Sequence, residues 1–280
     1  MLLSLLSDQP ERATGRVHLD LVGRTWAALE QTEWLLTNGI GGYASGTISG
    51  ANTRRYHGLL VAAFDPPGDR RLVFSKIDER LRTAVGTHEL ATNEWQDQSV
   101  SPKGYRLLTA FSAQPHPTWT YEDGGVCLTK EIILLPGQNT VQVRYRLASD
   151  SLPAELDLIW LVNHRDPHGE TDGKPDALYQ QMMTERGVLI QAHAGAHPLA
   201  LAWERGVYKR TDVWHYRIYY AREAERGQWA TEDLYNPGIT TVALAPGDSV
   251  TVTVTADGMP MALPWQAHAP ALIDTGSPQS

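Results

Sequence analysis

The first candidate for chemistry is a basic and aromatic cluster that follows a glycine-rich stretch. This stretch, residues 37–64, reads TNGIGGYASGTISGANTRRYHGLLVAAF and contains six glycines; its cluster consists of Arg54, Arg55, Tyr56 and His57. Planar guanidinium groups suit carboxylates and sugar hydroxyls, whereas charged groups are costly to bury without partners. The cluster therefore predicts either a solvated strand end or an edge that docks a ligand or a neighbouring domain.

The glycines themselves raise the question of a nucleotide site. Gly39, Gly41 and Ala44 spell G-x-G-x-x-A, a variant of the dinucleotide fingerprint, and Gly41 and Gly46 have P-loop spacing. The fingerprint requires a helix whose N-terminus holds the pyrophosphate, but the residues that follow are poor helix formers. Thr47 stands where the P-loop requires lysine. We therefore expect no nucleotide cofactor, and we interpret the glycines as sources of positive φ in a tight loop.

A second polar and aromatic stretch reads DVWHYRIYYAREAERGQWATEDLYNPG. Its candidate side chains are Trp214, Glu223, Arg226, Glu232 and Asp233. Carboxylates beside arginines are typical of ion pairs that order a loop. Aromatic faces beside charged groups are also typical of a sugar-binding or domain-contact surface. A catalytic acid at Glu223 or Glu232 is a third hypothesis, since glycoside hydrolysis requires two carboxylates at a set separation.

Two histidine pairs with a spacing of four residues suggest a metal site. His164 and His168 lie in HRDPH, where Pro167 prevents the regular helix that a helical zinc pair requires. His193 and His197 lie in HAGAH, which a glycine interrupts. We expect surface-loop histidines at both places and no metal ion.

Length, charge and cysteine content exclude several classes of protein. The chain has 280 residues, a formal net charge of −8 and one cysteine, Cys127. The length allows one large all-β domain or two ordinary domains. An acidic chain without a basic run argues against nucleic acid as a partner, and a lone cysteine favours a reducing, cytoplasmic location. The apolar start MLLSLL is too short for a signal core, and no stretch approaches the roughly 18 apolar residues of a membrane helix.

The elements that must position the candidate side chains are predicted to be strands. NTVQVRYRL and SVTVTVTA alternate apolar and polar residues, and ELDLIWLV is apolar on both faces, which predicts a strand covered on both sides. Turn signals such as EDGG, PGQN, ERG and PGDS separate the runs. The best candidate for a short helix is the start of the chain. The sequence therefore predicts an all-β fold, a large antiparallel β-sandwich.

The composition changes only near the C-terminus. The last 23 residues read GMPMALPWQAHAPALIDTGSPQS, with four prolines and no alternation. Such a segment is typical of a linker. We therefore predict a sandwich domain over residues 1–257 and a Pro-rich linker over residues 258–280, with a further domain expected beyond it.

Three stretches resemble the motifs of one family, and they occur in the family's order. EWLLTNGIGGYASGTISGANTRRYHGLLVAA corresponds to an opening motif, LVNHRDPH to a middle motif and YYAREAERGQWATEDLYNPG to a later one. The family that they resemble is the N-terminal domain of bacterial and archaeal-type glycogen debranching enzymes. Its later motif reads as an aromatic strand, E-x-x-R-G and E-D-L-x-x-P-G, which here are Glu223, Arg226, Gly227, Glu232, Asp233, Leu234, Pro237 and Gly238.

The resemblance implies a large β-sandwich, or supersandwich, of the kind that precedes (α/α) barrels in several glycoside hydrolases. The parent enzyme would be an amylo-α-1,6-glucosidase that hydrolyses branch points in glycogen catabolism. The family's catalytic carboxylates lie in the C-terminal barrel, so the resemblance assigns no catalytic residue to this chain. The implied partners are that barrel and a branched α-glucan such as glycogen or limit dextrin.

Together with the local chemistry, the resemblance gives a set of residues for substrate binding or domain docking: Asn38, Arg54, Arg55, Tyr56, His57, Trp214, Glu223, Arg226, Glu232 and Asp233. Two other functions stay open. A free-standing carbohydrate-binding module would present an exposed aromatic platform, such as Trp214 or Trp119. A complete small hydrolase would use Glu223, Glu232 or Asp233 as its acid and base.

Overall fold

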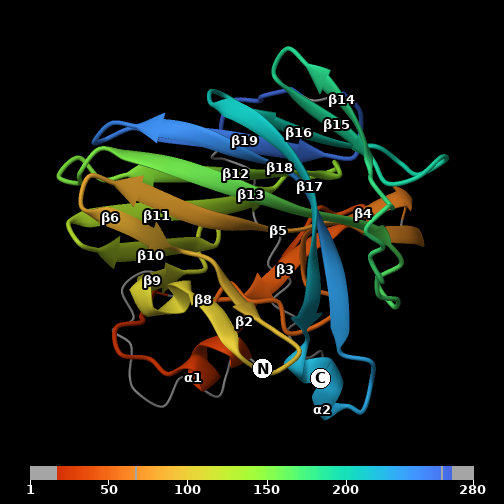
Figure 1. Ribbon diagram of the computed structural model, residues 1–280, viewed down its shortest axis with the longest axis horizontal. Coiled ribbons are helices and arrows are strands. Elements are labelled where there is room, and N and C mark those ends of the chain that lie inside the picture. Colours follow the sequence, from red (N-terminus) through yellow and green to blue (C-terminus); the bar gives the residue numbers. More distant parts are fainter. Residues whose placement is uncertain (1–17, 67, 260, 267–280) are drawn as a thin grey trace, which may run out of the picture.

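The computed structural model describes residues 18–66, 68–259 and 261–266, and two large antiparallel sheets dominate it (Figure 1). The first sheet has nine strands in the order β1 (His18–Asp20), β9 (Leu108–Ser112), β10 (Thr118–Asp123), β11 (Val126–Leu134), β12 (Thr140–Leu147), β19 (Ser249–Thr255), β16 (Leu199–Trp203), β15 (Gly187–Gln191) and β14 (Gln180–Thr184). The predicted all-β antiparallel sandwich is confirmed.

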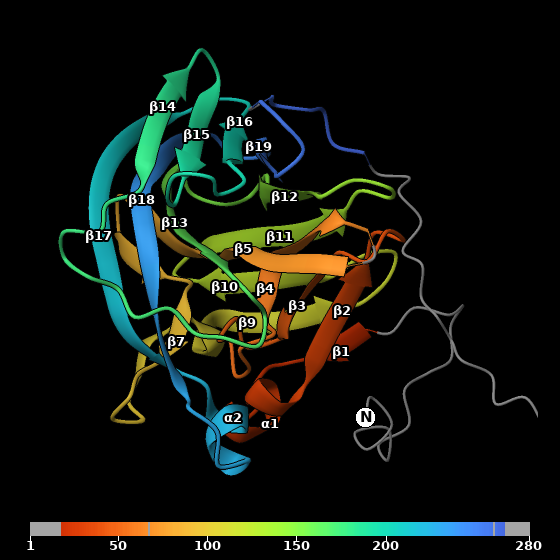
Figure 2. The ribbon, with the colours of Figure 1, turned by 90° about the vertical axis from the view of Figure 1, so that its right-hand side faces the viewer.

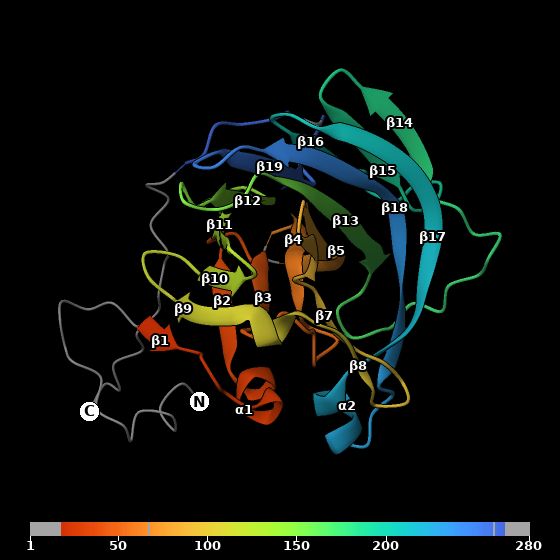
Figure 3. The same ribbon diagram turned by 60° about the vertical axis from the view of Figure 1, so that its left-hand side comes forward.

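The second sheet has eight strands and carries most of the candidate residues. Its order is β17 (Val207–Tyr219), β18 (Thr231–Leu244), β13 (Ala154–Arg165), β5 (Gly68–Thr83), β4 (Gly58–Asp65), β3 (Tyr43–Thr47) and β2 (Glu33–Thr37), and β6 (Gly86–Glu89) pairs with β5. A separate two-stranded ladder joins β7 (Thr92–Glu94) to β8 (Val100–Lys103). Figure 3 shows β17 and β18 as long curved strands that run down one side of the molecule towards the helix α2.

Period-two alternation builds the core between the sheets. In β12 every second residue from Val141 to Leu147 is fully buried, and the paired strand β19 buries Val250, Val252 and Val254 in the same way. Burying one side chain of this size stabilises the fold by about 1.5–3 kcal/mol relative to leaving it exposed. The alternation in these two segments therefore fixes which face of the strand points inward.

The strand β13 is buried on both faces, as its sequence predicts. Leu158 and Trp160 point into the main core, whereas Leu161 belongs to a second apolar cluster with Ile218 and Leu234. The second cluster lies on the other face of the eight-stranded sheet from the main core. The prediction for ELDLIWLV is confirmed.

Two short helices lie at one end of the sandwich, and neither was predicted. The helix α1 (Trp26–Gln31) has Thr25 as its N-cap, and α2 (Ala221–Glu225) follows β17 directly; a 3₁₀ turn, η1 (Gly104–Leu107), precedes β9. Helices of five or six residues are too short to show a 3.6-residue period. The helix predicted at the start of the chain lies outside the described residues.

The described part of the C-terminal tail lies against the nine-stranded sheet. Gln142 Nε2 donates to the carbonyl oxygens of Leu263 and Pro264, at 3.1 Å each. The Arg144 guanidinium lies 4.3 Å from the centre of the Trp265 ring, a cation–π contact. The first residues after β19 are thus attached to the sandwich, and residues 267–280 lie outside the described part of the chain. The predicted division at residue 257 stays a prediction.

Candidate functional site

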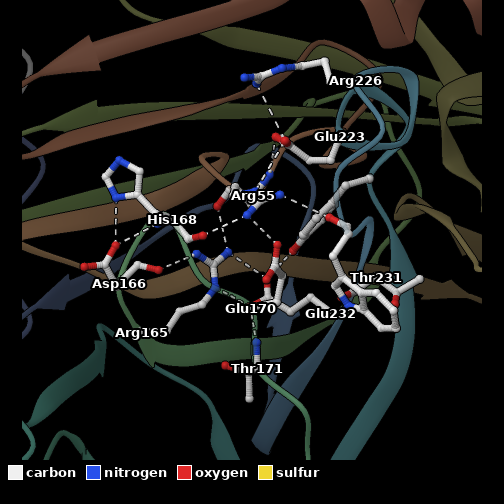
Figure 4. Close-up of polar contacts among 12 residues, drawn as sticks. Arg55, Arg165, Asp166, His168, Glu170, Thr171, Glu223, Arg226, Thr231 and Glu232 are labelled. Carbon is white, nitrogen blue, oxygen red and sulfur yellow. Dashed lines mark hydrogen bonds and ion pairs between the residues drawn. The ribbon is translucent and has the colours of Figure 1, made fainter.

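The three sequence motifs meet at the end of the sandwich where α1 and α2 lie (Figures 2 and 4). Arg55 comes from the loop before β4, Arg165 ends β13, Glu223 lies in α2 and Glu232 lies in β18. Arg55 and Arg165 are 110 residues apart in the sequence and are joined by a hydrogen bond. Tertiary structure therefore assembles one polar cluster from segments whose local sequences carry no sign of their contact. We refer to Arg55, Arg165, Glu170, Glu223 and Glu232 as the polar junction.

Arg55 connects three loops within the polar junction. Its guanidinium lies 2.7 Å from Glu170 Oε1 and 3.4 Å from Glu223 Oε2. These are charge contacts without hydrogen-bond alignment, whereas Nη1 donates to the His168 carbonyl at 2.8 Å and Nη2 to the Trp229 carbonyl at 3.2 Å. The residue is 8% exposed. A buried guanidinium with partners on two other loops and on the helix α2 holds these segments at fixed positions.

Glu232 is the most heavily bonded carboxylate of the junction. Its side chain is fully buried, and the Arg165 guanidinium donates to both of its oxygens. Oε1 also accepts from Asn163 Nδ2 at 2.9 Å and from the Thr171 backbone N–H at 3.1 Å, while Oε2 accepts from the Tyr220 hydroxyl. Five hydrogen bonds thus occupy both oxygens. In this arrangement Glu232 anchors the surrounding loops and presents no free oxygen to a sugar.

Arg165 is a residue that sequence reasoning missed. Burial lowers its pKa, but the adjacent Glu232 carboxylate more than reverses this, so the pKa of Arg165 lies above its ordinary value. Nη2 of Arg165 also donates to the Arg55 carbonyl at 2.7 Å. In the stretch LVNHRDPH, the sequence singles out the histidines as metal candidates and the whole run as a family motif, but it gives Arg165 no role of its own. The signal that could have found Arg165 is the arginine beside them, at the end of a strand predicted to be buried on both faces.

Glu223 and Arg226 occupy the short helix α2 and the residue that caps it. The Glu223 side chain is 1% exposed, and its Oε1 accepts from the Arg55 backbone N–H at 3.3 Å. Arg226 is 57% exposed, and its Nη1 lies 3.7 Å from Glu223 Oε2. The predicted pairing of these charges in an ordered loop therefore exists, with the carboxylate inside and the guanidinium at the surface (Figure 4).

Arg54 and His57 form a second ion-pair group on the edge strand β2. Arg54 Nε donates to Glu33 Oε1 at 2.7 Å, and His57 Nε2 lies 3.5 Å from the same oxygen. His57 Nδ1 accepts from the Thr53 backbone N–H, so Nε2 carries the ring proton. Burial raises the pKa of Glu33, but hydrogen bonds from His57 and Arg54 outweigh it and bring the pKa to about 2. Glu33 is a second residue that sequence reasoning did not single out.

Asn38 lies apart from these groups and orders the glycine loop. Its Nδ2 donates to the Gln138 carbonyl at 2.9 Å, and its Oδ1 accepts from the Ile40 backbone N–H at 3.1 Å. Gly39 and Gly41 have φ angles of 78° and 102°, a region that glycine adopts without steric cost. The glycines therefore form a tight turn between β2 and β3, as the sequence predicts, and the turn is tied to the β11–β12 connection through Asn38.

Asp233 also lies outside the polar junction. Its carboxylate accepts from two backbone N–H groups, those of Arg217 and Gly173, at 2.8 Å each. The side chain of Asp233 therefore fixes the backbone of two other segments. Its neighbour in the sequence, Glu232, points to the junction instead.

Neither tryptophan considered for a sugar platform is exposed. Trp214 is 7% exposed and packs against Tyr179 and Tyr235, and Trp119 is 3% exposed and packs edge-on to Trp34. The exposed platform that a free-standing carbohydrate-binding module would present is therefore not formed by Trp214 or Trp119. Tryptophans that pack against other aromatic rings in this way stabilise the core of the fold.

The surface above the polar junction is mixed aromatic and charged. The Trp229 side chain is 63% exposed, and the Tyr56 ring lies edge-on to the exposed His168 ring, with 5.6 Å between their centres. Arg226 lies at the same end (Figure 4). We refer to Tyr56, His168, Arg226 and Trp229 as the exposed rim. The arrangement suits the presentation of a rigid surface, because ion pairs and hydrogen bonds hold the charged groups beneath it in place.

The histidine pairs of the sequence are separated and regrouped. His164 lies 5.2 Å from His193 and 6.4 Å from His197, measured between ring centres, while His168 lies at the exposed rim. Burial, together with the neighbouring His193, lowers the pKa of His164 to about 4. Within residues 18–66, 68–259 and 261–266, no group of three His, Cys, Asp or Glu side chains is arranged as a metal site.

The helices of the described part of the chain are all short. None of them is long and apolar enough to cross a membrane.

Comparison with known proteins places the chain in a family. The sequence model of the family described as "Glycogen debranching enzyme N terminal" matches residues 32–251, more than three quarters of the chain. Among solved structures, a bacterial glucoamylase complexed with acarbose is similar, with 11% identity, a TM-score of 0.38 and coverage of 85% of this chain and 35% of the glucoamylase chain. Comparison with curated proteins finds no match. The matched residues include all three motifs and the entire polar junction.

Proposed function

Because the chain belongs to the family of glycogen debranching enzyme N-terminal domains, we propose that it is the non-catalytic β-sandwich domain of such an enzyme. The activity of the whole enzyme would be hydrolysis of α-1,6-glucosidic branch points in glycogen or limit dextrin. The partner of the domain would be a catalytic (α/α) barrel of the same enzyme. Residues 258–280 would begin the connection to this barrel, and the enzyme would act in the cytoplasm.

The observation that carries the proposal is the saturation of Glu232, together with the burial of Glu223, within the polar junction. Five hydrogen bonds occupy the oxygens of Glu232, and Glu223 is 1% exposed beside Arg55 and Arg226. A general acid or base must be within hydrogen-bond reach of the proton that it transfers. Carboxylates that are already held in ion pairs do not meet this requirement. The geometry therefore favours a structural role for the domain and argues against a complete small hydrolase built on these residues.

The exposed rim is the surface on which we expect the barrel to dock. It combines an exposed tryptophan, Trp229, with a tyrosine and an arginine, the residue types enriched at the centres of protein interfaces. Beneath it, Arg55 bonds to the carbonyl oxygens of His168 and Trp229. A rigid surface loses little conformational freedom on binding. This would explain why the buried charges of three motifs converge directly under the rim.

A free-standing carbohydrate-binding module is the alternative. The burial of Trp214 and Trp119 removes the platform first considered for it, but a glucan site at another surface would serve the same function. Direct contribution of the domain to glucan binding is therefore part of the proposal, and it is separable from docking by experiment.

The first experiment compares the 280-residue chain alone with the same chain joined to a debranching-enzyme barrel, by release of glucose from a branched limit dextrin. We expect activity only in the joined protein. Activity in the chain alone would overturn the non-catalytic assignment and return attention to Glu223, Glu232 and Asp233.

The second experiment tests the rim in the joined protein. Trp229→Ala should lower kcat/KM and the melting temperature of the joined protein while leaving the melting temperature of the isolated chain within about 2 °C, because the exposed ring contributes little to the fold. Val85→Ala is the matched control, because Val85 lies in the turn between β5 and β6 and is also exposed, at 66%. This variant should change neither kcat/KM nor the melting temperature of the joined protein. Equal behaviour of both variants in the joined protein would exclude the rim as the docking surface.

A further inference from the structure

A hollow on the outside of the eight-stranded sheet, lined by none of the polar-junction residues, has the composition of a ligand site. It is shallow and wide open to solvent, has a volume of about 410 Å³ and is lined by Trp95, Gln96, Asp97, Ser99 and Arg217. The loop 95–99 joins β7 to β8, and Arg217 lies in β17, so the two walls come from distant parts of the sequence. Figure 2 shows the β7–β8 hairpin beside the lower part of β17.

Arg217 is held at this hollow in a strained backbone conformation. Its φ angle is +65°, a left-handed value that is uncommon for residues other than glycine and costs of order 1 kcal/mol or more. It lies in an irregular part of the β17–β18 ladder, between His215 and Ile218, where the register shifts. Such bulges re-aim a side chain and recur next to functional sites.

The strain is maintained by specific contacts. The Arg217 backbone N–H donates to Asp233 Oδ1 at 2.8 Å, and its carbonyl accepts from the Gln96 backbone N–H at 3.0 Å. Asp233 belongs to the E-D-L-x-x-P-G motif, yet it takes no part in the polar junction. Its position indicates that one purpose of this motif residue is to fix the bulge that presents Arg217.

The functional ends of the lining side chains stay available. Within the described residues, the Arg217 guanidinium makes no ion pair or hydrogen bond, although Asp97 lies in the same hollow. Asp97 Oδ1 accepts from the Ser99 N–H and hydroxyl, at 3.0 and 2.6 Å, and within the described residues Oδ2 accepts no hydrogen bond. Trp95 Nε1 donates to the Ser101 carbonyl at 2.7 Å, and this bond fixes the orientation of the indole ring.

We propose that the Trp95–Arg217 hollow is a binding site for a neutral oligosaccharide. The Trp95 ring packs against the second apolar cluster and is only partly buried, so its exposed part offers apolar area to a sugar ring. A guanidinium and a carboxylate can each bind a pair of neighbouring hydroxyls. One positive and one negative group line the hollow, which favours an uncharged, hydroxyl-rich ligand over a phosphate or a polyanion. That the oligosaccharide is an α-glucan rests on the proposed function; that the site binds sugar rests on the hollow itself.

The decisive variant is Arg217→Gly in the full 280-residue chain. Glycine accepts a positive φ without steric cost, so we expect a melting temperature equal to that of the wild type or up to about 3 °C above it. Binding of maltoheptaose, measured by calorimetry and by the indole N–H resonance of Trp95, should weaken by at least about tenfold. Gln98→Gly is the matched control: Gln98 also has a positive φ, of 62°, in the adjacent loop, and this variant should retain wild-type binding.

The outcomes separate the site from the proposed function. Saturable movement of the Trp95 resonance with maltoheptaose, lost in Arg217→Gly and kept in Gln98→Gly, supports both. Binding of maltoheptaose that Arg217→Gly leaves unchanged overturns this site while glucan binding by the domain stands. If cellohexaose or xylohexaose binds at this hollow and maltoheptaose does not, the site is supported and an α-glucan is excluded as its ligand. No movement with any of these sugars at millimolar concentration overturns the proposal.

Discussion

The substitution Glu232→Gln removes the central charge of the polar junction and preserves its shape. Glu232 is fully buried and accepts five hydrogen bonds, two of them from Arg165. A glutamine in its place keeps one acceptor oxygen and turns an NH₂ group towards donors. Arg165, whose side chain is 6% exposed, then lies buried without its counter-charge.

The size of the effect follows from this burial. Removing one partner of a buried pair costs about 3–5 kcal/mol, because the remaining charge is desolvated without compensation. With an unfolding entropy of about 2.1 cal/mol/K per residue, a cooperative chain of 280 residues loses roughly 1.7 °C per kcal/mol. We therefore expect Glu232→Gln to lower the melting temperature by about 5–8 °C.

The assay is thermal and urea unfolding, followed by tryptophan fluorescence and circular dichroism at pH 7. Glu155→Gln is the matched control, because Glu155 pairs with Arg82 at the surface with a side chain that is 58% exposed; it should change stability by less than about 0.5 kcal/mol. In a double-mutant cycle with Arg165→Met, the coupling energy should exceed about 1 kcal/mol. A loss below about 1 kcal/mol for Glu232→Gln would refute the assignment of the junction as a buried charged anchor.

Three further predictions concern other parts of the fold. Burial raises the pKa of Glu94 to about 7, so the folded state keeps a proton that the unfolded chain releases near pH 4.5. Above pH 7 the buried carboxylate is charged, and this charge destabilises the folded state. In urea titrations, Glu94→Gln should therefore stabilise the protein at pH 8 but not at pH 4. Burial raises the pKa of Glu131, but hydrogen bonds from His116 and Arg144 bring it to about 2. The stabilisation by Glu131 is therefore present above pH 4.5 and is lost as the pH falls to 2. In the variant Glu131→Gln, the urea midpoint of unfolding should depend less on pH within this window. A Cβ atom at Gly104 would overlap the backbone carbonyl oxygens of the adjacent loop; Gly104→Ala should lower the melting temperature by at least about 3 °C, and an unchanged value would contradict the close backbone approach.

The strands were the most predictable part of the molecule. Each alternating run, such as the one that contains Val141 and Val143, indicates within eight residues which side chains face inward. The loops were less predictable. The glycine turn after Asn38 was correctly expected to need positive φ, whereas the helices α1 and α2 were missed because five or six residues carry no measurable period.

The candidate site was predictable in its residue types but not in its grouping. Arg55, Glu223 and Glu232 were selected from their motifs, and the structure brings them together. Asp233 was selected with them, although it serves the Arg217 bulge instead. Adjacent residues of a strand point to opposite faces, so neighbours in a motif can belong to different sites.

The sequence by itself determined the fold class, the apolar faces of the strands, the turn chemistry and, through its motifs, the family. These properties are local, because a period of two and a glycine at positive φ need only a few neighbouring residues. Tertiary structure alone decided that Arg165 pairs with Glu232, that Trp214 is buried and that Trp95 and Arg217 line one hollow. These contacts depend on the register and curvature of strands that can lie more than a hundred residues apart in the sequence. No short stretch of sequence determines that geometry.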